Sequence, residues 1–239
     1  MRYDVDKIVE HISTLGICVL KDYLSKEDCE TAIEEMDQSL IVHKDKVQRI
    51  EAEGCGGDER LFSFENASSI AKKVYDDKML IDVCTKYLGT ESECFQVLAG
   101  KVTSVEGKTI NSGGGWHRDA VEKQFKSILY LSDVGEKNAP FQFIPQSANT
   151  IVERRNDSRG TRFTDLGVEK IGIPPLTVTA PAGTLVLVST TNIHRGSNII
   201  EGSRYSFTNY YYGKNHVIGN KWDKWSIPKS PQAKKSIGL

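Results

Sequence analysis

The residues of this sequence best suited to chemistry are two histidines and one aspartate. His117 and Asp119 close the segment Gly113-Gly-Gly-Trp-His-Arg-Asp119. In an extended segment, residues two apart point to the same side, so this imidazole and this carboxylate can face one point. His194 follows 75 residues after Asp119, just beyond an apolar run. Two histidines and a carboxylate that leave further positions open suit a non-haem iron(II) ion that must also bind oxygen and a co-substrate.

A second pair of polar residues stands ten residues beyond His194. Arg204 and Ser206 lie at positions of equal parity in a predicted strand, so both can face the same interior. A buried arginine is costly unless a carboxylate or phosphate satisfies its planar fork, and a dicarboxylate co-substrate would supply that partner. The other three histidines have no partner at metal-ligand spacing; they are His11, His43 and His216.

The first ninety residues are predicted to be mostly helical. Apolar residues at helical spacing predict a helix over residues 5–15 that stops at Gly16, followed by a short strand over 17–20. Ser25 is the expected N-cap of a second helix, and a further helical stretch is expected from about Asn66 to Leu88. Residues 43–60 are charged and contain Gly54, Gly56 and Gly57, which predicts a mobile loop.

Beyond Gly89 the sequence changes to short runs rich in β-branched and aromatic residues, with turn residues between them. The predicted strands are residues 94–98, 125–131, 141–144, 176–179, 184–188 and 204–212. Many short strands after a helical third predict a mainly β fold. We expect an antiparallel double-stranded β-helix (a cupin-like jelly roll) with helices packed on one outer face.

Composition excludes several classes of protein. With 31 basic and 32 acidic side chains the net charge is -1, so no overall field attracts nucleic acid or an acidic membrane. The longest apolar runs are four or five residues where a membrane span needs about 20, and the N-terminus lacks the features of a secretory signal. The five cysteines form no CxxC motif, which favours reduced thiols and a cytoplasmic location.

Three segments resemble the phytanoyl-CoA dioxygenase-like branch of the iron(II)/2-oxoglutarate oxygenases. They are WHRD (116–119), ILYLSDVGEKNAPFQFIPQSANT (128–150) and GTLVLVSTTNIHRGSNIIEGSRYSFTNYYY (183–212). The resemblance implies a jelly roll in which His117, Asp119 and His194 hold Fe(II), while Arg204, assisted by Ser206, grips the far carboxylate of 2-oxoglutarate. It also implies the use of molecular oxygen, release of succinate and carbon dioxide, and hydroxylation of an aliphatic C–H group.

The sequence departs from the family pattern at two turns. The family's usual IPGSH is IPQSAN over residues 144–149, and its common Gly-Asp is Gly183-Thr184. Neither change removes a ligand, but both affect the loops that would face the substrate. Two rival interpretations stay open: a cupin-like zinc hydrolase or isomerase, since the same ligands suit catalytic zinc, and a non-catalytic small-molecule binding barrel. Arg204 is the residue that the zinc interpretation leaves unexplained.

The remaining expectations concern substrate and organisation. Lys126, Ile128 and Tyr130 share one strand face and would line the co-substrate pocket if that face is internal. Trp116 either walls the substrate cavity or packs on the barrel rim. Arginines beside the ligands and in the long connection would bind an anionic substrate, unless local acids offset them; they are Arg118, Arg195, Arg154, Arg155, Arg159 and Arg162.

We expect a single domain over residues 1–239, with a mostly helical part to about 92, a jelly-roll core over 93–212 and a tail over 213–239. The tail is basic, with six lysines from Lys214 on, and it carries Trp222 and Trp225. It could pack over the barrel, join a dimer interface or touch acidic partners. The expected partner is a small-molecule substrate, with neither nucleic acid nor membrane, and a homodimer stays open.

Overall fold

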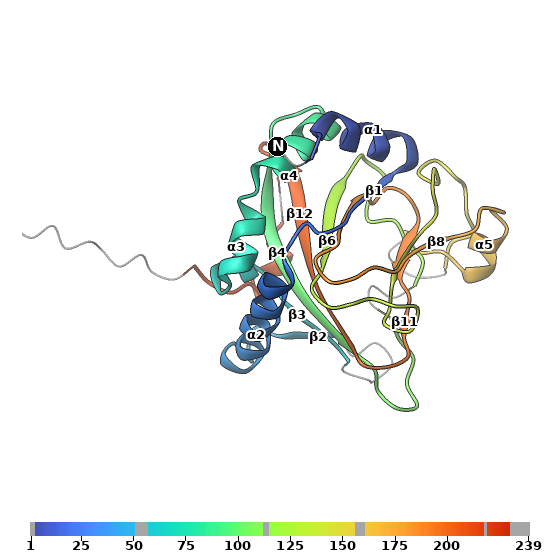
Figure 1. Ribbon diagram of the computed structural model, residues 1–239. Coiled ribbons are helices and arrows are strands. Elements are labelled where there is room, and N and C mark those ends of the chain that lie inside the picture. The colour runs from blue at the N-terminus through green and yellow to red at the C-terminus, as the bar shows by residue number, and fades with distance from the viewer. Residues whose placement is uncertain (1–2, 51–56, 112–114, 156–160, 218, 230–239) are drawn as a thin grey trace, which may run out of the picture.

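The computed structural model describes residues 3–50, 57–111, 115–155, 161–217 and 219–229. Its largest sheet has seven strands in the order β1-β9-β6-β12-β4-β3-β2, and all neighbours are antiparallel. These strands are β1 (Ile17–Leu20), β9 (Leu185–Ser189), β6 (Phe125–Tyr130), β12 (Ser203–Gly213), β4 (Ser92–Thr103), β3 (Asp58–Leu61) and β2 (Gln48–Ile50). The long strands β4 and β12 run side by side through the middle of the molecule (Figure 1).

Two smaller sheets complete the β structure. One has the order β10-β7-β8, with β10 (His194–Gly196), β7 (Phe141–Phe143) and β8 (Leu176–Val178). The other pairs β11 (Asn198–Ile199) with β5 (Ile110–Asn111). A buried cluster that includes Tyr130, Phe141 and Val186 joins β6 and β9 to the three-stranded sheet. This arrangement confirms the predicted cupin-like double-sheet fold.

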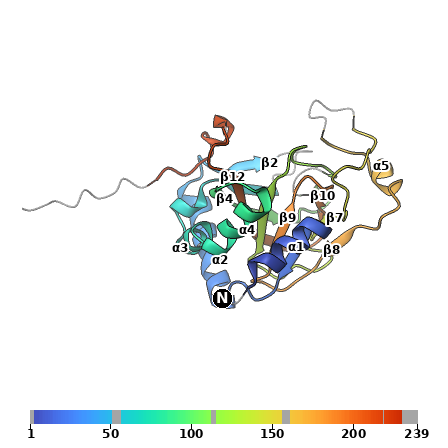
Figure 2. The ribbon, with the colours of Figure 1, turned by 90° about the horizontal axis from the view of Figure 1, so that it is seen from above.

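Four helices cover the opposite face of the large sheet, as Figure 1 shows. They are α1 (Val5–Leu15), α2 (Lys26–Val42), α3 (Ser69–Tyr75) and α4 (Lys78–Leu88). The core between helices and sheet holds Ile12, Met36, Leu80 and Phe207, each almost fully buried. Figure 2 shows the short helix α5 (Asp165–Glu169) at the other end of the molecule, away from these four.

The predicted helix boundaries agree with local capping. Helix α1 ends at Gly16, whose φ of 84° is left-handed, and the side chain of Ser25 accepts a hydrogen bond from the backbone N–H of Asp28 at the start of α2. The helical stretch over residues 66–88 is two helices instead of one. The side chain of Asp77 caps a new helix by accepting from the backbone N–H groups of Met79 and Leu80, so α4 begins there.

The loop predicted for residues 43–60 is wrong in part, because this region contributes β2 and β3 to the large sheet. Charge within these strands is offset locally: Arg60 binds the carboxylate of Asp58 through two hydrogen bonds of 2.9 and 2.6 Å. Gly54 and Gly56 lie outside the described residues. All seven predicted strands are present, including the one over residues 17–20, whereas the very short β5, β10 and β11 were not predicted.

In the described part of the chain, no helix combines the length and the apolar character needed to cross a bilayer. Four of the five cysteines are described and each is a buried free thiol; they are Cys18, Cys29, Cys84 and Cys94, while Cys55 lies outside that part.

Candidate metal centre

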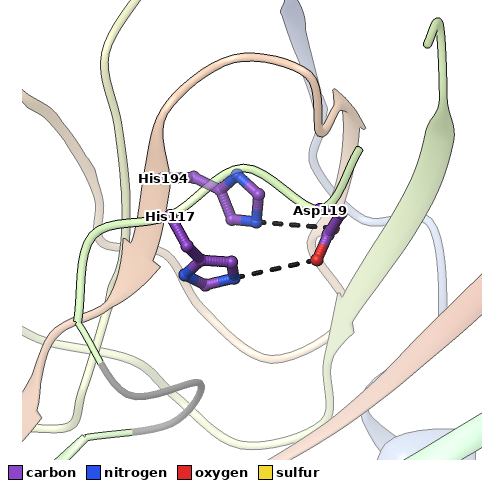
Figure 3. Close-up of side chains that lie close together, drawn as sticks. All are labelled: His117, Asp119 and His194. Atoms are coloured by element: carbon purple, nitrogen blue, oxygen red, sulfur yellow. Dashed lines mark ion pairs between the residues drawn. The ribbon is translucent and has the colours of Figure 1, made fainter. Parts of the chain in front are cut away.

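Backbone pairing brings the three predicted ligands together from two distant segments. His117 and His194 exchange backbone hydrogen bonds of 3.0 Å in both directions, forming an antiparallel bridge. The N–H of Asp119 donates to the carbonyl of Thr190 at 3.1 Å, which fixes the second half of the His-Arg-Asp segment against the loop before His194. The alternation expected from the sequence then turns both side chains of that segment to one side, toward His194 (Figure 3).

The ligand atoms of the three residues lie within 4.8 Å of one another. Nε2 of His117 is 3.8 Å from Oδ1 of Asp119, and Nε2 of His194 is 3.6 Å from Oδ2 of the same carboxylate. Two ligands that each lie about 2.1 Å from one ion can be at most about 4.2 Å apart. The distance from His117 to Oδ1 therefore fits two ligands of one ion, and His194 lies against the other oxygen of the same carboxylate.

Hydrogen bonds to the far nitrogen of each ring set the tautomer that a metal needs. Nδ1 of His117 lies 2.8 Å from the carbonyl of Gly115, and Nδ1 of His194 lies 2.9 Å from the carbonyl of Asn192. A carbonyl can only accept, so each Nδ1 carries a proton, and in the neutral imidazole that binds a metal Nε2 then keeps its lone pair. Both lone pairs face Asp119, and carbonyl partners of this kind orient metal-bound histidines.

A buried lysine holds the third ligand. Nζ of Lys126 donates to Oδ2 of Asp119 at 2.6 Å, and the ammonium also lies 4.3 Å from the ring centre of Tyr210. Only 8% of Lys126 is exposed, so this contact is shielded from solvent. The pair fixes one carboxylate oxygen and leaves Oδ1 directed toward His117.

The protonation states of the site are those of metal ligands. Burial, with His194 close by, lowers the pKa of His117 to about 3, so its imidazole is neutral. Burial alone would raise the pKa of Asp119, but the ammonium of Lys126 outweighs it and holds that pKa well below its usual range. Burial opposes the charge of Lys126, yet the carboxylate beside it raises the lysine's pKa. A neutral imidazole and a carboxylate can bind a cation without first losing a proton.

The predicted Arg204–Ser206 pair lies on β12 and is buried inside the fold. Ser206 lies directly opposite Tyr130 of the neighbouring strand β6. Arg204 is 7% exposed, and its Nη1 donates to the carbonyl of Ala139. Its Nε has no hydrogen-bond partner among the described residues, and no described carboxylate lies within ion-pair distance of it. Burial lowers the pKa of this guanidinium. An anion in the interior would satisfy it.

The strand next to Ser206 carries no side chain at the position that faces this serine. Gly100 of β4 is its direct cross-strand neighbour, and a Cβ on Gly100 would meet Leu98 at 3.6 Å and Oγ of Ser206 at 3.8 Å. The missing side chain leaves room on the inner wall next to the serine hydroxyl. Arg204, Ser206 and Gly100 thus form a cradle with a cationic end.

Four of the arginines proposed for substrate binding have partners within the protein, whereas Arg154 is exposed and its backbone pairs with Phe163. Arg118 donates to the carbonyls of Ser147 and Thr150, and Arg195 donates to Gln142 at 2.8 Å and to Asp165 at 3.0 Å. Arg155 and Arg162 also make contacts within the chain, and Arg159 lies outside the described residues. An anion-binding role for them stays a prediction without support from these contacts.

Trp116 is 3% exposed and packs with Ile144, Phe163 and Ile193, while the guanidinium of Arg195 lies 4.2 Å from its ring centre. Of the two roles considered for Trp116, packing at the rim is the one that the structure shows.

Solved structures with a similar fold include enzymes that are described as non-haem and alpha-ketoglutarate-dependent. A crystal structure of the epimerase SnoN in complex with Fe3+, alpha-ketoglutarate and nogalamycin RO superposes with a TM-score of 0.70, at 15% identity over 87% of this chain and 83% of that one. The chain has the fold of these enzymes. EctD from S. alaskensis, with 2-oxoglutarate and 5-hydroxyectoine, gives 0.70 at 18% identity, covering 92% and 79%. HygX from Streptomyces hygroscopicus, with nickel and 2-oxoglutarate, gives 0.64 at 14% identity and 88% of both chains.

No model of a protein family matches the sequence, and no curated protein matches it. The similarity is therefore one of fold, and the chemistry of this chain has to be argued from its own residues.

Sequence reasoning missed two features of the site. It placed Lys126 on the inner face but did not pair it with Asp119, a contact that depends on the path of the chain between them. It also passed over Gln96, a buried amide in the middle of β4. A glutamine inside the apolar run Cys94–Leu98 is the signal that could have drawn attention to it.

Proposed function

We propose that this chain is an Fe(II)- and 2-oxoglutarate-dependent dioxygenase that hydroxylates an aliphatic C–H group of a small polar metabolite. The observation that carries the proposal is the joint presence of two features within the β fold. Three ligands with both Nε2 lone pairs facing Asp119 lie there, and so does a buried arginine without a carboxylate partner among the described residues. A metal site alone would not require the arginine.

The residues fit the two groups. His117 and His194 would bind Fe(II) through Nε2, and Asp119 would bind through the oxygen that Lys126 leaves unoccupied. Arg204 would pair with the far carboxylate of 2-oxoglutarate, with Ser206 as a further donor in the space beside Gly100. Bound together, iron and 2-oxoglutarate would activate oxygen and oxidise a substrate C–H bond, with release of succinate and carbon dioxide.

The chain's own task is positioning. The carbonyls of Gly115 and Asn192 hold both imidazole rings, and Lys126 holds the carboxylate, so the ligands need little reorganisation to bind a cation. Tyr130, Phe141 and Val186 belong to one buried apolar cluster, and the ring centre of Phe141 lies 5.6 Å from that of His194. This cluster would help to keep water from the bound iron.

Placement in the phytanoyl-CoA dioxygenase-like branch and hydroxylation, as opposed to another oxidative outcome, belong to this proposal as its finer parts. They rest on the sequence segments around His117, Asp119 and His194. A zinc hydrolase would use the same three ligands, but it gives no role to the unsatisfied guanidinium of Arg204.

Turnover of 2-oxoglutarate tests the proposal. Purified protein supplied with Fe(II), ascorbate, oxygen and 2-oxoglutarate should form succinate, and His117→Ala or His194→Ala should abolish this while the circular dichroism spectrum stays unchanged. An exposed-histidine variant, His11→Ala, serves as the control and should retain full turnover, because His11 lies on the outer side of α1. Succinate formation that persists in either ligand variant would contradict the assignment.

A further inference from the structure

Gln96 is buried with its whole side-chain amide unpaired. The residue is 1% exposed, and neither Nε2 nor Oε1 has a hydrogen-bond partner in the described part of the chain. Buried polar groups are paired in the great majority of cases, because an unpaired one opposes folding. Both the donor and the acceptor of the Gln96 amide are unpaired among the described residues, which indicates that a bound molecule pairs with them.

Strand alternation directs Gln96 toward the inside of the barrel. Its neighbour Val97 belongs to the core under the helices, and so does Ala99. Gln96 must point to the other face, which also carries Leu98 and Gly100. This is the face on which the Arg204–Ser206 cradle lies.

The strand register places Gln96 in a row that reaches the metal ligands. Gln96 lies directly opposite Tyr210 of β12, and Tyr210 lies directly opposite Lys126 of β6. Lys126 in turn donates to Asp119 at 2.6 Å. The row therefore ends at the carboxylate of the metal-binding group.

Aromatic rings flank the row. The ring of Trp222 lies 6.2 Å from that of Tyr210 and stacks at 4.8 Å on Phe62. The segment that carries Trp222 is held against the sheet by a hydrogen bond of 2.9 Å from the N–H of Ile227 to the carbonyl of Phe62. Figure 2 draws this segment in red near β2 and β12. Residues 219–229 thus add an aromatic wall beside the row.

The charged groups around the row are already paired. Lys126 is bound to Asp119, and Arg60 is bound to Asp58 through two hydrogen bonds. The groups left to recognise a ligand here are the uncharged amide of Gln96 and aromatic surface. Such a surface suits a neutral group that both donates and accepts hydrogen bonds, next to an apolar or ring-shaped portion.

We propose that Gln96 is the polar anchor of the primary-substrate site. It would take an uncharged portion of the substrate that carries a donor and an acceptor side by side, such as a carboxamide or a vicinal diol, with Tyr210 and Trp222 against its apolar part. The inference rests on the proposed function, because it treats the row as part of the chamber that faces the metal. It narrows the substrate class from polar metabolites in general to those with such a neutral group.

The first test needs no substrate. Gln96→Leu keeps the size of the side chain and removes the unpaired amide, so urea unfolding of the metal-free variant should show an unfolding constant at least fivefold lower than that of the wild type. Gln142→Leu is the matched control. The amide of Gln142 donates to Thr177 at 3.2 Å and accepts from Arg195 at 2.8 Å, so its loss should raise the unfolding constant. A higher unfolding constant for Gln96→Leu would overturn the proposal, since it would mean that the fold satisfies the amide.

The second test measures substrate-stimulated succinate release with N-acetylated amino-acid amides and amine-free cyclitols as neutral probes and sugar phosphates as charged ones. A neutral probe should stimulate the wild type, and Gln96→Leu should need at least tenfold more of it for half-maximal stimulation. Stimulation by the phosphates alone, or equal half-saturation in both proteins, would overturn the proposal. Binding of Fe(II) and 2-oxoglutarate should be unchanged in Gln96→Leu. If the wild type binds neither Fe(II) nor 2-oxoglutarate, the proposed function is refuted. If it binds both and Gln96→Leu responds to the neutral probe as the wild type does, only the role of Gln96 is refuted.

Discussion

Replacing Arg204 by methionine separates a co-substrate clamp from a structural arginine. The guanidinium is buried, makes one backbone hydrogen bond to Ala139, and has an Nε without a partner among the described residues. A methionine of similar length removes the charge and keeps most of the packing volume. Because an incompletely paired buried charge is costly, the metal-free Arg204→Met variant should be as stable as the wild type or more so by about 1 kcal/mol.

The affinity for 2-oxoglutarate should change in the opposite sense. Hydrogen bonds to a charged group contribute about 1.5–3 kcal/mol, and each 1.4 kcal/mol is tenfold in affinity. The Kd for 2-oxoglutarate should therefore rise roughly 10- to 150-fold, with Arg204→Lys only partly restoring the lost fork. Calorimetry during anaerobic titration of 2-oxoglutarate into the Fe(II) protein gives the Kd of the wild type and of each variant.

Arg49→Met is a suitable control because it removes the same charge from an exposed pair with Glu59. Its Kd should stay within twofold of the wild type. The reasoning fails if Arg204→Met binds 2-oxoglutarate as tightly as the wild type does, or if it unfolds while Arg204→Lys restores stability and leaves the affinity unchanged.

Three further outcomes follow from the geometry of the site. Because the pKa of His117 is lowered to about 3 in the folded protein from an ordinary 6.5, the unfolded chain binds an extra proton between these values. The unfolding free energy of metal-free protein should thus fall by about 2–3 kcal/mol from pH 6.5 to 4.5. The loss should be smaller in His117→Gln. Equal losses in both proteins would count against a buried neutral imidazole. Gly100→Ala should change the unfolding free energy by less than about 1 kcal/mol, since a Cβ there makes only ordinary contacts. The added methyl group should weaken 2-oxoglutarate binding severalfold, because it fills the space beside Ser206. Unchanged binding by calorimetry would place the co-substrate elsewhere. Lys126→Met leaves the buried carboxylate of Asp119 without its partner and should destabilise metal-free protein by about 3 kcal/mol. Adding Ni(II) should raise the Tm of this variant more than that of the wild type. An unchanged urea midpoint would mean that the pair is absent.

Local signals carried much of the fold and of the candidate site. Gly16 and Ser25 set helix ends through a left-handed φ and a side-chain cap, effects that operate within a few residues and are therefore visible in sequence. The His-x-Asp spacing placed two ligands on one side of an extended segment for the same reason. The distal ligand, His194, came from residue type and chain order, and the structure brings it to the other two through a backbone bridge.

Features that depend on distant pairing could not be predicted in this way. Strand β3 is short and charged, and it forms because β4 offers a free edge and because Arg60 pairs with Asp58. The contact of Lys126 with Asp119 requires the seven-residue path between them to fold back on itself, which no period in the sequence encodes. The same holds for the row that joins Gln96, Tyr210 and Lys126, since only the register of three strands defines it.

The most direct measurement of the central claim is the visible absorption of the protein during anaerobic addition of Fe(II) and then 2-oxoglutarate. A charge-transfer band should grow to saturation at one equivalent of each, and it should be lost in His117→Ala and His194→Ala. A protein that binds zinc in preference and develops no band with iron and 2-oxoglutarate, or a band that survives both ligand variants, would contradict the account.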